Sequence, residues 1–350
     1  MKLELIILVA TSAVVVFADS LPVYRSTEKT SKGHKHALAA AVRRCATATG
    51  SSDKSGHGVS LTDNSDFLYT TTVSLHGQSF SFDIDTGHRM SGCEALRANP
   101  PKVPATWTTL YGSDSVTGKI YNGAVVLGGI SATINFGVTT HETGMSGSDG
   151  LWGLSYSLGN EIFGGNFVST AGISSHAWYL LNSANGDNGE ITFNGVDTTK
   201  YTGTLQYFPM VIGQFWYSFN PSGGSFVANG VTVKLTGSLA IDSGTSLLIL
   251  PTAQAASINK PIDAGAWPEH NCSKRTTGVP ITVAIGGASV KINPAEYVIA
   301  DGSICVSGIT GEDLGSGNPS NIFGDTFMRA AYTVYDVKNS RFGIARAVHP

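Results

Sequence analysis

The sequence predicts an all-β fold arranged in two similar lobes. A chain of 350 residues is long enough for two domains with sizeable hydrophobic cores. From about residue 60 to residue 348, short runs of β-branched and aromatic residues alternate with turns rich in Gly, Asn, Asp and Ser. A short motif also occurs twice, half a chain apart. These observations together indicate two β-rich halves of related structure.

The repeated motif is an Asp followed by a small hydroxyl residue and a Gly. It occurs as Asp85-Thr86-Gly87 and, 157 positions later, as Asp242-Ser243-Gly244, each time after apolar β-forming residues. A carboxylate at the end of a buried strand is costly to desolvate, and the Gly lets another backbone approach closely. Either copy alone would be interpreted as a turn. Two copies in matched context indicate that each lobe delivers one carboxylate to a shared cleft.

The strand-forming runs are spread along the whole chain. We expect strands at residues 67–75, 80–84, 123–127, 132–138, 189–194, 281–285 and 331–336. Helical structure is expected at residues 252–258, directly after Pro251, and in a turn near residues 311–314.

Composition and motif content exclude several classes of protein. Charged residues make up 13% of the chain, compared with roughly 25% in ordinary globular proteins. This low charge suits an extracellular β protein and argues against a nucleic-acid binder, which needs a basic surface. No cysteine spacing resembles a zinc site, His141-Glu142 lacks the second His of a metalloprotease helix, and no Gly-x-Ser-x-Gly is present. We therefore expect no metal and no cofactor.

The N-terminus has the pattern of a targeting segment followed by a basic leader. An apolar run over residues 5–17 predicts a secretory signal peptide at residues 1–20; a membrane anchor is the alternative, but the run is short for a span. Residues 21–44 carry six basic residues and one acidic residue, whereas residues 45–350 carry 15 basic and 22 acidic residues. Opposite charges suit a propeptide at residues 21–44 that docks on the mature protein, with an unstructured linker as the alternative.

These features resemble the pepsin family of aspartic proteases, from about residue 57 to residue 348, and in particular its secreted, fungal-type members. Residues 148–154 and 320–325 are similar to the apolar-apolar-Gly element that runs beside each catalytic loop in that family. Residues 189–203 resemble the segment that joins the lobes. The resemblance implies the bilobal pepsin-like acid protease fold, with an N-terminal lobe and its flap at residues 45–203 and a C-terminal lobe at residues 204–350.

The resemblance also implies a disulfide bond. The chain has four cysteines, and an even number in an oxidising compartment favours two bridges. Cys272 and Cys305 lie where the family has its C-terminal-lobe disulfide. Cys45 and Cys93 remain, and their spacing does not match the short disulfide loop of animal pepsins.

By the same resemblance, Asp85 and Asp242 form a catalytic pair that holds a water molecule. Two close carboxylates share one proton, so the pair supplies a base and an acid at once. The ionised member takes a proton from the attacking water while the protonated member donates to the scissile carbonyl. The implied activity is that of a secreted, extracellular aspartic endopeptidase. It would act on protein or peptide substrates at acid pH as a monomer, after acid releases its own propeptide.

The resemblance further implies a set of substrate-binding residues. The hairpin at residues 110–118 resembles the flap that closes over a bound peptide; an ordinary exposed hairpin is the alternative. Asp83 and Asp114, the two acidic residues of the set, would favour a substrate with Lys or Arg before the scissile bond; two unrelated surface carboxylates are the alternative. The set comprises Tyr111, Gly112, Ser113, Gly87, Gly244, Thr245, Asp83 and Asp114.

Two positions depart from the family pattern. His88 stands where the family has a Ser or Thr that bonds the catalytic carboxylate, and Gly92 stands where it commonly has a Trp. A protonated His88 would lower the pKa of a neighbouring Asp, which predicts a shifted pH optimum. The alternative is a weakened protein of the same fold that binds peptides or proteins without cutting them.

Overall fold

Short strands dominate the computed structural model. It describes residues 56–87, 91–93, 102–111, 114–142, 148–155, 166–182, 188–211, 216–264, 269–301, 303–315 and 318–349. The expected signal peptide, the expected propeptide and Cys45 lie outside these residues. The described helices are α2 (Phe167–Thr170), α3 (Thr252–Asn259), α4 (Lys274–Thr277), α5 (Pro294–Tyr297) and α6 (Asp325–Met328). The all-β expectation is confirmed, and no helix in the described ranges is long and apolar enough to cross a membrane.

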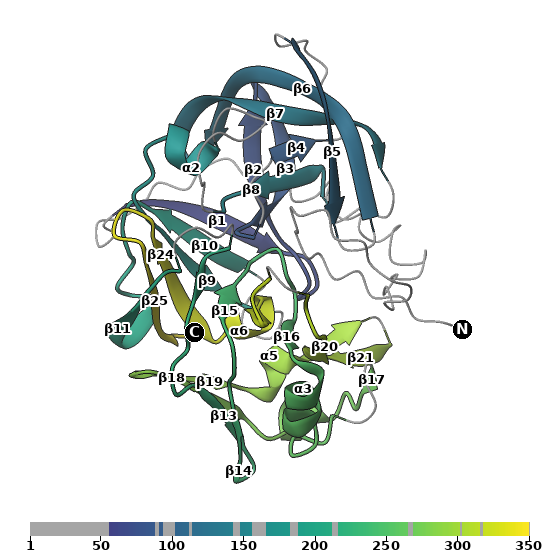
Figure 1. The fold of residues 1–350 in the computed structure, drawn as a ribbon, viewed down its shortest axis with the longest axis vertical. Helices are drawn as coiled ribbons and strands as arrows, with labels where there is room; N and C mark the ends of the chain where they lie inside the picture. The colour runs from purple at the N-terminus through teal and green to yellow at the C-terminus, as the bar shows by residue number, and fades with distance from the viewer. Residues whose placement is uncertain are drawn as a thin grey trace.

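The first half of the chain forms a layered set of strands, drawn in purple to teal at the top and centre of Figure 1. Its strands are β1 (His57–Asp63), β2 (Tyr69–Leu75), β3 (Gln78–Asp85), β4 (Ser91–Cys93), β5 (Lys102–Tyr111), β6 (Asp114–Leu127), β7 (Ile130–Glu142), β8 (Gly150–Gly153), β9 (His176–Leu180) and β10 (Asn188–Phe193).

Strands from both halves share the largest sheet. It includes β11 (Tyr201–Pro209), β24 (Ala331–Asp336) and β25 (Arg341–Ala347), in the order β11-β25-β24-β9-β10-β1-β2-β3-β8-β4-β7-β6-β5. The last two strands of the chain therefore lie between β9 and β11, at the left of the molecule in Figure 1. The expected lobe boundary at residue 203 falls inside β11, and the division into lobes stays a prediction.

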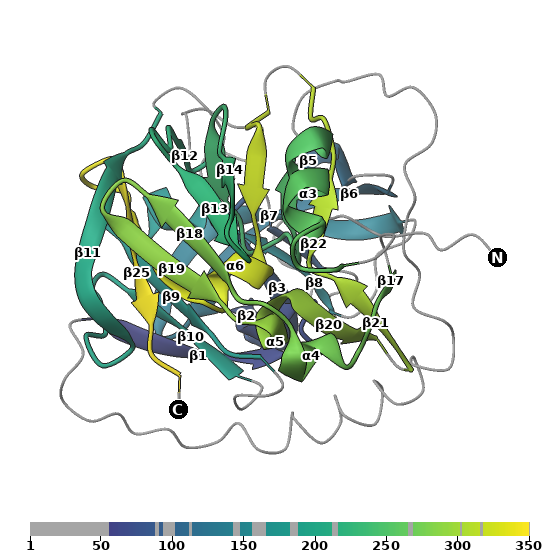
Figure 2. The same cartoon turned by 90° about the horizontal axis from the view of Figure 1, so that it is seen from below.

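The second half builds three smaller sheets, seen from below in Figure 2. Their orders are β12-β15-β23-β16-β22, β14-β13-β18-β19 and β17-β21-β20. The bounds are β12 (Ser218–Phe219), β13 (Ser225–Ala228), β14 (Val231–Lys234), β15 (Leu239–Ile241), β16 (Leu248–Leu250), β17 (Glu269–His270), β18 (Ile281–Ile285), β19 (Ala288–Ile292), β20 (Val298–Asp301), β21 (Ile304–Ser307), β22 (Ile309–Gly311) and β23 (Asn321–Phe323).

The two halves repeat one topology around the repeated motif. In the first half β3 pairs in parallel with β8, β8 pairs antiparallel with β4, and β4 pairs in parallel with β7. In the second half β15, β23, β16 and β22 make the same three pairings in the same order. The apolar-apolar-Gly elements are β8 and β23, so each runs beside the strand that carries an Asp, as expected.

Each strand expected from the sequence is present, and two of them, β18 and β24, have the expected bounds. The helix expected at residues 252–258 is α3, which follows Pro251. The prediction of a helical turn near residues 311–314 is wrong. Gly311 ends β22 against β16, and the amide of Glu312 donates to the carbonyl of Leu250, so strand pairing takes the backbone groups that a helical turn would use.

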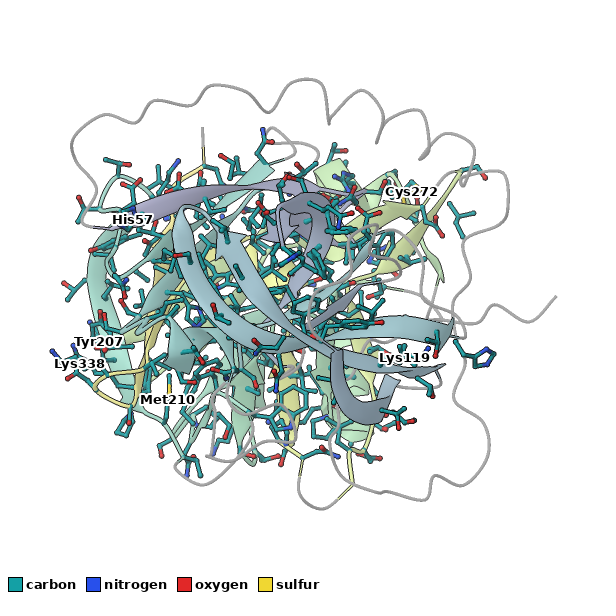
Figure 3. The ribbon with its side chains drawn as sticks, turned by 90° about the horizontal axis from the view of Figure 1, so that it is seen from above. His57, Lys119, Tyr207, Met210, Cys272 and Lys338 are labelled. Carbon is teal, nitrogen blue, oxygen red and sulfur yellow. A yellow bond between two sulfur atoms is a disulfide. The ribbon has the colours of Figure 1, made fainter. Side chains whose placement is uncertain are left out.

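A disulfide joins Cys272 to Cys305 on β21, with the Cα atoms 5.2 Å apart. It closes a loop of 33 residues, and linking the ends of a loop of that length stabilises the folded chain by about 4 kcal/mol. In Figure 3 Cys272 lies at the opposite edge of the molecule from Tyr207 and Lys338. The partner of Cys93 stays a prediction, because Cys45 is outside the described ranges.

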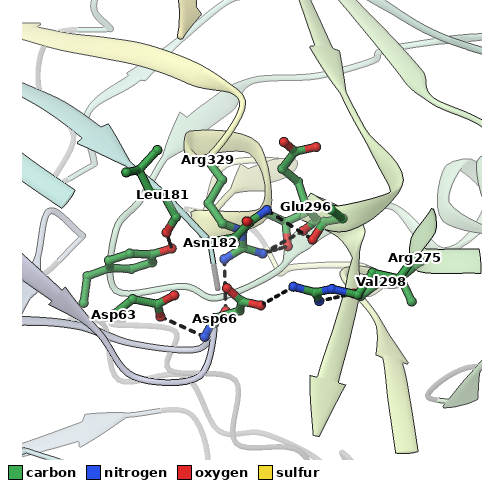
Figure 4. Close-up of polar contacts among 11 residues, drawn as sticks. Asp63, Asp66, Leu181, Asn182, Arg275, Glu296, Val298 and Arg329 are labelled. Atoms are coloured by element: carbon green, nitrogen blue, oxygen red, sulfur yellow. Dashed lines mark hydrogen bonds and ion pairs between the residues drawn. The ribbon is translucent and has the colours of Figure 1, made fainter. Parts of the chain in front are cut away.

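A buried polar cluster ties the β1–β2 turn to the second half of the chain (Figure 4). Arg329 is 0% exposed and donates to the carbonyl oxygens of Asp66 (3.0 Å) and Glu296 (2.7 Å). Arg275 forms an ion pair with the Asp66 carboxylate at 3.1 Å. The Asp66 amide in turn donates to Asp63 Oδ1 at 2.8 Å. These contacts link the β1–β2 turn directly to residues of the second half of the chain.

Candidate active site

Asp85 is the last residue of β3 and is completely buried. Its backbone pairs with Gly153 of β8, and its carbonyl accepts a hydrogen bond from the Leu154 amide at 2.8 Å. Beneath it, Phe82 packs edge-to-face on Trp152, with ring centroids 5.7 Å apart. An aromatic pair of this kind adds about 1 kcal/mol to the burial of its surface. The strand that carries Asp85 is therefore anchored in the hydrophobic core by a buried aromatic pair.

Asp242 follows β15 and is also completely buried. Its amide donates to the carbonyl of Phe323 on β23 at 3.0 Å, and the Asp325 amide donates to the Thr245 carbonyl at 2.8 Å. A Cβ built on Gly324 would lie 1.8 Å from the Thr245 carbonyl oxygen. Only a glycine fits there, which explains the Gly of the β23 element.

The two Asp-containing loops contact each other. A Cβ built on Gly244 would lie 2.3 Å from Cγ of Asp85, and one built on Gly87 would lie 2.7 Å from Oδ1 of Asp242. Each loop thus presses its glycine against the carboxyl group of the other loop. The structure brings the two carboxyls together, although they are 157 residues apart in the chain.

The hydroxyl residues of the two motifs lock the loops by exchanged hydrogen bonds. The Thr86 amide donates to Ser243 Oγ at 3.1 Å, and the Ser243 amide donates to Thr86 Oγ1 at 2.9 Å. Ser243 Oγ also donates to the Ile84 carbonyl at 2.6 Å. Sequence reasoning assigned no role to this pair. The signal was present, because a small hydroxyl residue follows the Asp in both motifs.

Hydrogen bonds distinguish the two carboxyls. Asp242 accepts from the Gly244 amide at 3.1 Å and from the Thr245 hydroxyl at 2.6 Å. Among the described residues Asp85 accepts from the Gly87 amide at 2.7 Å, and its Oδ2 accepts from none. Donors stabilise an ionised carboxylate, so the charge of the pair is favoured on Asp242.

The pKa values of both carboxyls are raised, and burial is the main cause. The pKa of Asp85 is raised well above its ordinary value by burial first and then by the charges of Asp242 and Asp83. Burial also raises the pKa of Asp242, but the hydrogen bonds from Thr245 and Gly244 oppose the rise. The pair therefore keeps one proton over a wide pH range, as acid–base catalysis by two carboxyls requires.

Asp83 lies two residues before Asp85 on the same face of β3 and is 3% exposed. Burial raises its pKa well above the ordinary range, and the charge of Asp242 adds to the rise. Asp325, at the start of α6, is 1% exposed and shows the same direction of pKa shift for the same main cause. Sequence reasoning missed Asp325, although it directly follows the apolar-apolar-Gly element.

The expected flap is a hairpin of β5 and β6, in which the backbone of Tyr111 pairs with that of Asp114. Gly112, Ser113 and His88 lie outside the described residues. Gly92 lies on β4, opposite Leu151 of β8. The Gly87 amide donates to the Asp85 carboxyl, and the Gly244 amide and the Thr245 hydroxyl donate to the Asp242 carboxyl. Their contacts with a substrate remain predictions.

The described ranges contain no group of three His, Cys, Asp or Glu side chains that could hold a metal ion. A surface hollow of about 240 Å³ is lined by residues including Ser174, Tyr207, Asp336 and Lys338, and by none of the expected site residues.

Comparison with known proteins identifies the family. Residues 101–347 match the family described as "Eukaryotic aspartyl protease", a match that contains Asp242 and begins after Asp85. The chain is 28% identical to an aspartic protease of Phaffia rhodozyma over 90% of its length and 84% of that protein. It is 30% identical to pepsin A of Bos taurus, over 81% and 84% of the two chains. It is 28% identical to an acid extracellular protease of Yarrowia lipolytica, over 80% and 81%. The chain therefore belongs to the eukaryotic aspartyl protease family, the pepsin-like aspartic endopeptidases.

Proposed function

We propose that this protein is a secreted endopeptidase that hydrolyses peptide bonds at acid pH with Asp85 and Asp242 as its catalytic pair. The observation that carries the proposal is the interlocking of the two loops, in which Gly244 presses on the Asp85 carboxyl and Gly87 on the Asp242 carboxyl. Two carboxyls held in one buried site share a proton and so supply an acid and a base.

In this mechanism Asp242 is the base and Asp85 the acid. The hydrogen bonds from Gly244 and Thr245 favour the charge on Asp242. Asp242 takes a proton from a water molecule as the water oxygen attacks the scissile carbonyl carbon. Asp85 donates its proton to the carbonyl oxygen, which gives a neutral tetrahedral diol. Proton transfer to the departing nitrogen then breaks the C–N bond. The apparent pKa values belong to the pair rather than to either residue.

Secretion and acid activation complete the proposal. The apolar run at residues 5–17 supports a signal peptide, and one relative is named an acid extracellular protease. The leader at residues 21–44 is basic and the rest of the chain is acidic, which supports a propeptide that is released when acid neutralises the carboxylates. We expect the full chain to be latent at neutral pH and to lose this leader below about pH 5. A protein lacking residues 21–44 that folds, yet at pH 4 begins to cleave with the same lag as the full chain, would contradict the propeptide's role.

The activity itself is tested with acid-denatured haemoglobin as substrate. We expect cleavage below about pH 5 that a statine-containing peptide, a mimic of the tetrahedral intermediate, abolishes. Measuring new amino groups across pH 2 to 7, with and without the inhibitor, checks this. Cleavage that resists the inhibitor would contradict the assignment. Tight binding of the inhibitor without any cleavage would favour the second candidate, a peptide-binding protein, which His88 and Gly92 support because they depart from the family pattern.

A further inference from the structure

Four buried side chains with polar atoms lie beneath the catalytic loops. They are His176 and Trp178 on β9, Tyr335 on β24 and Tyr217 directly before β12. All four are at most 1% exposed. The residues Tyr335 and His176 are opposite each other in the β24–β9 pairing, and their rings stack with centroids 4.5 Å apart at 15°. The mechanism above uses none of them.

The Tyr335 hydroxyl connects the two catalytic loops. It donates its proton to the carbonyl of Ile241, the residue before Asp242, at 3.2 Å. Since that proton is in use, the contact of 3.3 Å with Thr86 Oγ1 requires Thr86 to be the donor. On the opposite side Ser243 reaches the Ile84 carbonyl directly at 2.6 Å. The locked loops are thus asymmetric, with one tyrosine hydroxyl inserted on the Asp242 side.

The insertion changes where the Thr86 proton points. Thr86 Oγ1 has a single proton and three possible acceptors: Tyr335 Oη at 3.3 Å, Ser243 Oγ at 3.4 Å and Asp242 Oδ1 at 3.5 Å. A proton given to Tyr335 is not available to Asp242. A hydrogen bond to an ionised carboxylate lowers its pKa. Tyr335 therefore keeps one further donor away from the carboxylate that acts as the base.

The other three side chains fix the Tyr335 ring. Trp178 Nε1 donates to His176 Nδ1 at 2.9 Å, which leaves the imidazole proton on Nε2, 3.4 Å from the Tyr217 hydroxyl. Tyr217 donates to the Leu154 carbonyl at 2.9 Å. With both ring nitrogens engaged, the imidazole plane that stacks on Tyr335 has one orientation.

We propose that Tyr335 is a positioning residue for the catalytic pair: its hydroxyl joins Thr86 to the Ile241 carbonyl, sets how the two loops approach, and withholds the Thr86 proton from Asp242. His176 holds the Tyr335 ring in place. This inference rests on the proposed use of Asp85 and Asp242 in catalysis.

The groups that can titrate near this assembly are few in the described part of the chain. Asp242 follows β15, Asp85 and Asp83 lie on β3, Asp325 lies on α6, and Tyr217 and His176 lie beside the Tyr335 ring. Burial lowers the pKa of His176 to about 3, so the imidazole is neutral across most of the acid range. A shift of the catalytic pH profile on changing Tyr335 then reports the carboxyl pair rather than the histidine.

The test compares Tyr335→Phe with Tyr297→Phe in the full, acid-activated protein. Tyr297 is a matched control, since it is 0% exposed and its hydroxyl makes one hydrogen bond of 2.8 Å, to the Val279 carbonyl. The probe is a fluorescence-quenched peptide that spans a haemoglobin site cleaved by the wild type. In Tyr335→Phe the Thr86 proton turns to Asp242, because an ionised carboxylate accepts more strongly than the Ser243 hydroxyl. The acid limb of the kcat profile then moves down by about 0.5 to 1 pH unit. We expect kcat at the optimum to fall about fivefold, the effect of one lost hydrogen bond, with KM changed less than about twofold.

Three outcomes would overturn the inference. A Tyr335→Phe profile that coincides with that of Tyr297→Phe removes the positioning role and leaves the proposed function intact. A Tyr335→Phe protein that does not fold while Tyr297→Phe does would assign Tyr335 to the fold rather than to the pair. A wild type that neither cleaves the peptide nor binds the statine inhibitor overturns the proposed function, and this inference with it.

Discussion

Asp85→Asn and Asp242→Asn are each expected to lower kcat/KM for peptide hydrolysis by at least about 1000-fold at the optimum pH. An asparagine has nearly the same shape as an aspartic acid, but it neither takes up nor releases a proton in this range. Each variant therefore removes one of the two proton transfers while it leaves the interlocked loops in place. The measurement is steady-state hydrolysis of the quenched peptide by acid-activated wild type and variants.

Asp149→Asn is the matched control for these variants. Asp149 directly precedes β8, and its Oδ2 accepts from the Ser81 amide at 2.8 Å, a bond that an asparagine oxygen can also accept. We expect its activity to be within about twofold of the wild type. If either Asp85→Asn or Asp242→Asn kept more than about a hundredth of the wild-type kcat/KM, the assignment of the pair would be wrong.

The two asparagine variants should differ in stability. Asp85→Asn keeps an oxygen for the Gly87 amide, and its new NH₂ group can donate to the Asp242 carboxylate. Asp242→Asn has one oxygen for two donors, the Gly244 amide and the Thr245 hydroxyl, so one donor loses its acceptor. A buried donor without a partner costs about 1 to 3 kcal/mol. The melting temperature of Asp242→Asn should therefore be lower than that of Asp85→Asn, and the reverse order would contradict the hydrogen-bond assignment.

The features that sequence could predict are those written in short, repeated patterns. The motif at Asp85 and Asp242 and the Gly-containing elements of β8 and β23 recur in the same order in both halves, so they predict one topology used twice. Strand period and turn residues locate the strands because these signals are local. The exchanged bonds between Thr86 and Ser243 follow once two such loops are placed face to face.

The contacts that sequence could not predict depend on which distant strands become neighbours. The residues Tyr335 and Thr86 are 249 positions apart, and they meet because β24 inserts between β9 and β25 in the central sheet. Nothing in the sequence around Arg329 shows that its guanidinium is fully buried against the β1–β2 turn, 263 residues away. The burial of Asp83 is equally a property of the packed site, since an Asp in a strand faces solvent or core according to its neighbours.

Stability should fall as the pH rises from about 4 to about 8, and Asp63 is expected to contribute much of this loss. Burial, with the nearby charge of Asp66, raises the pKa of Asp63 from 3.8 to about 8. A carboxyl with a raised pKa binds its proton more tightly in the folded chain than in the unfolded chain. Its stabilising contribution is therefore complete below pH 4 and is lost as the pH approaches 8. Burial also raises the pKa values of Glu296 and Asp325, which act in the same direction.

Asp63→Asn should flatten this pH dependence. The asparagine oxygen can accept the Asp66 amide bond of 2.8 Å, and the side chain stays neutral at every pH, as the protonated Asp63 does in the folded chain. We expect the wild type to lose about 2 to 4 kcal/mol more unfolding free energy between pH 4 and pH 7 than the variant does. Urea unfolding at both pH values measures this, with Asp85→Asn in both proteins so that self-digestion does not intervene.

An exposed carboxyl provides the control for Asp63. Asp263 pairs with Lys274 at 2.9 Å, and the hydrogen bond and charge of Lys274 lower its pKa. Its stabilising contribution is present above pH 4 and is lost only at lower pH, the opposite sign to Asp63. Asp263→Asn should therefore leave the decrease in unfolding free energy between pH 4 and pH 7 unchanged.

The prediction for Asp63 has a contradicting outcome. If the unfolding free energy of Asp63→Asn decreases as steeply as that of the protein with Asp63, other groups cause the loss of stability at neutral pH, and the cluster around Arg329 tolerates an ionised Asp63. If the decrease is smaller in Asp63→Asn, the contacts between the two halves are most stable at acid pH. A neutral Asp63 leaves the contacts of Asp66 with Arg275 and Arg329 undisturbed.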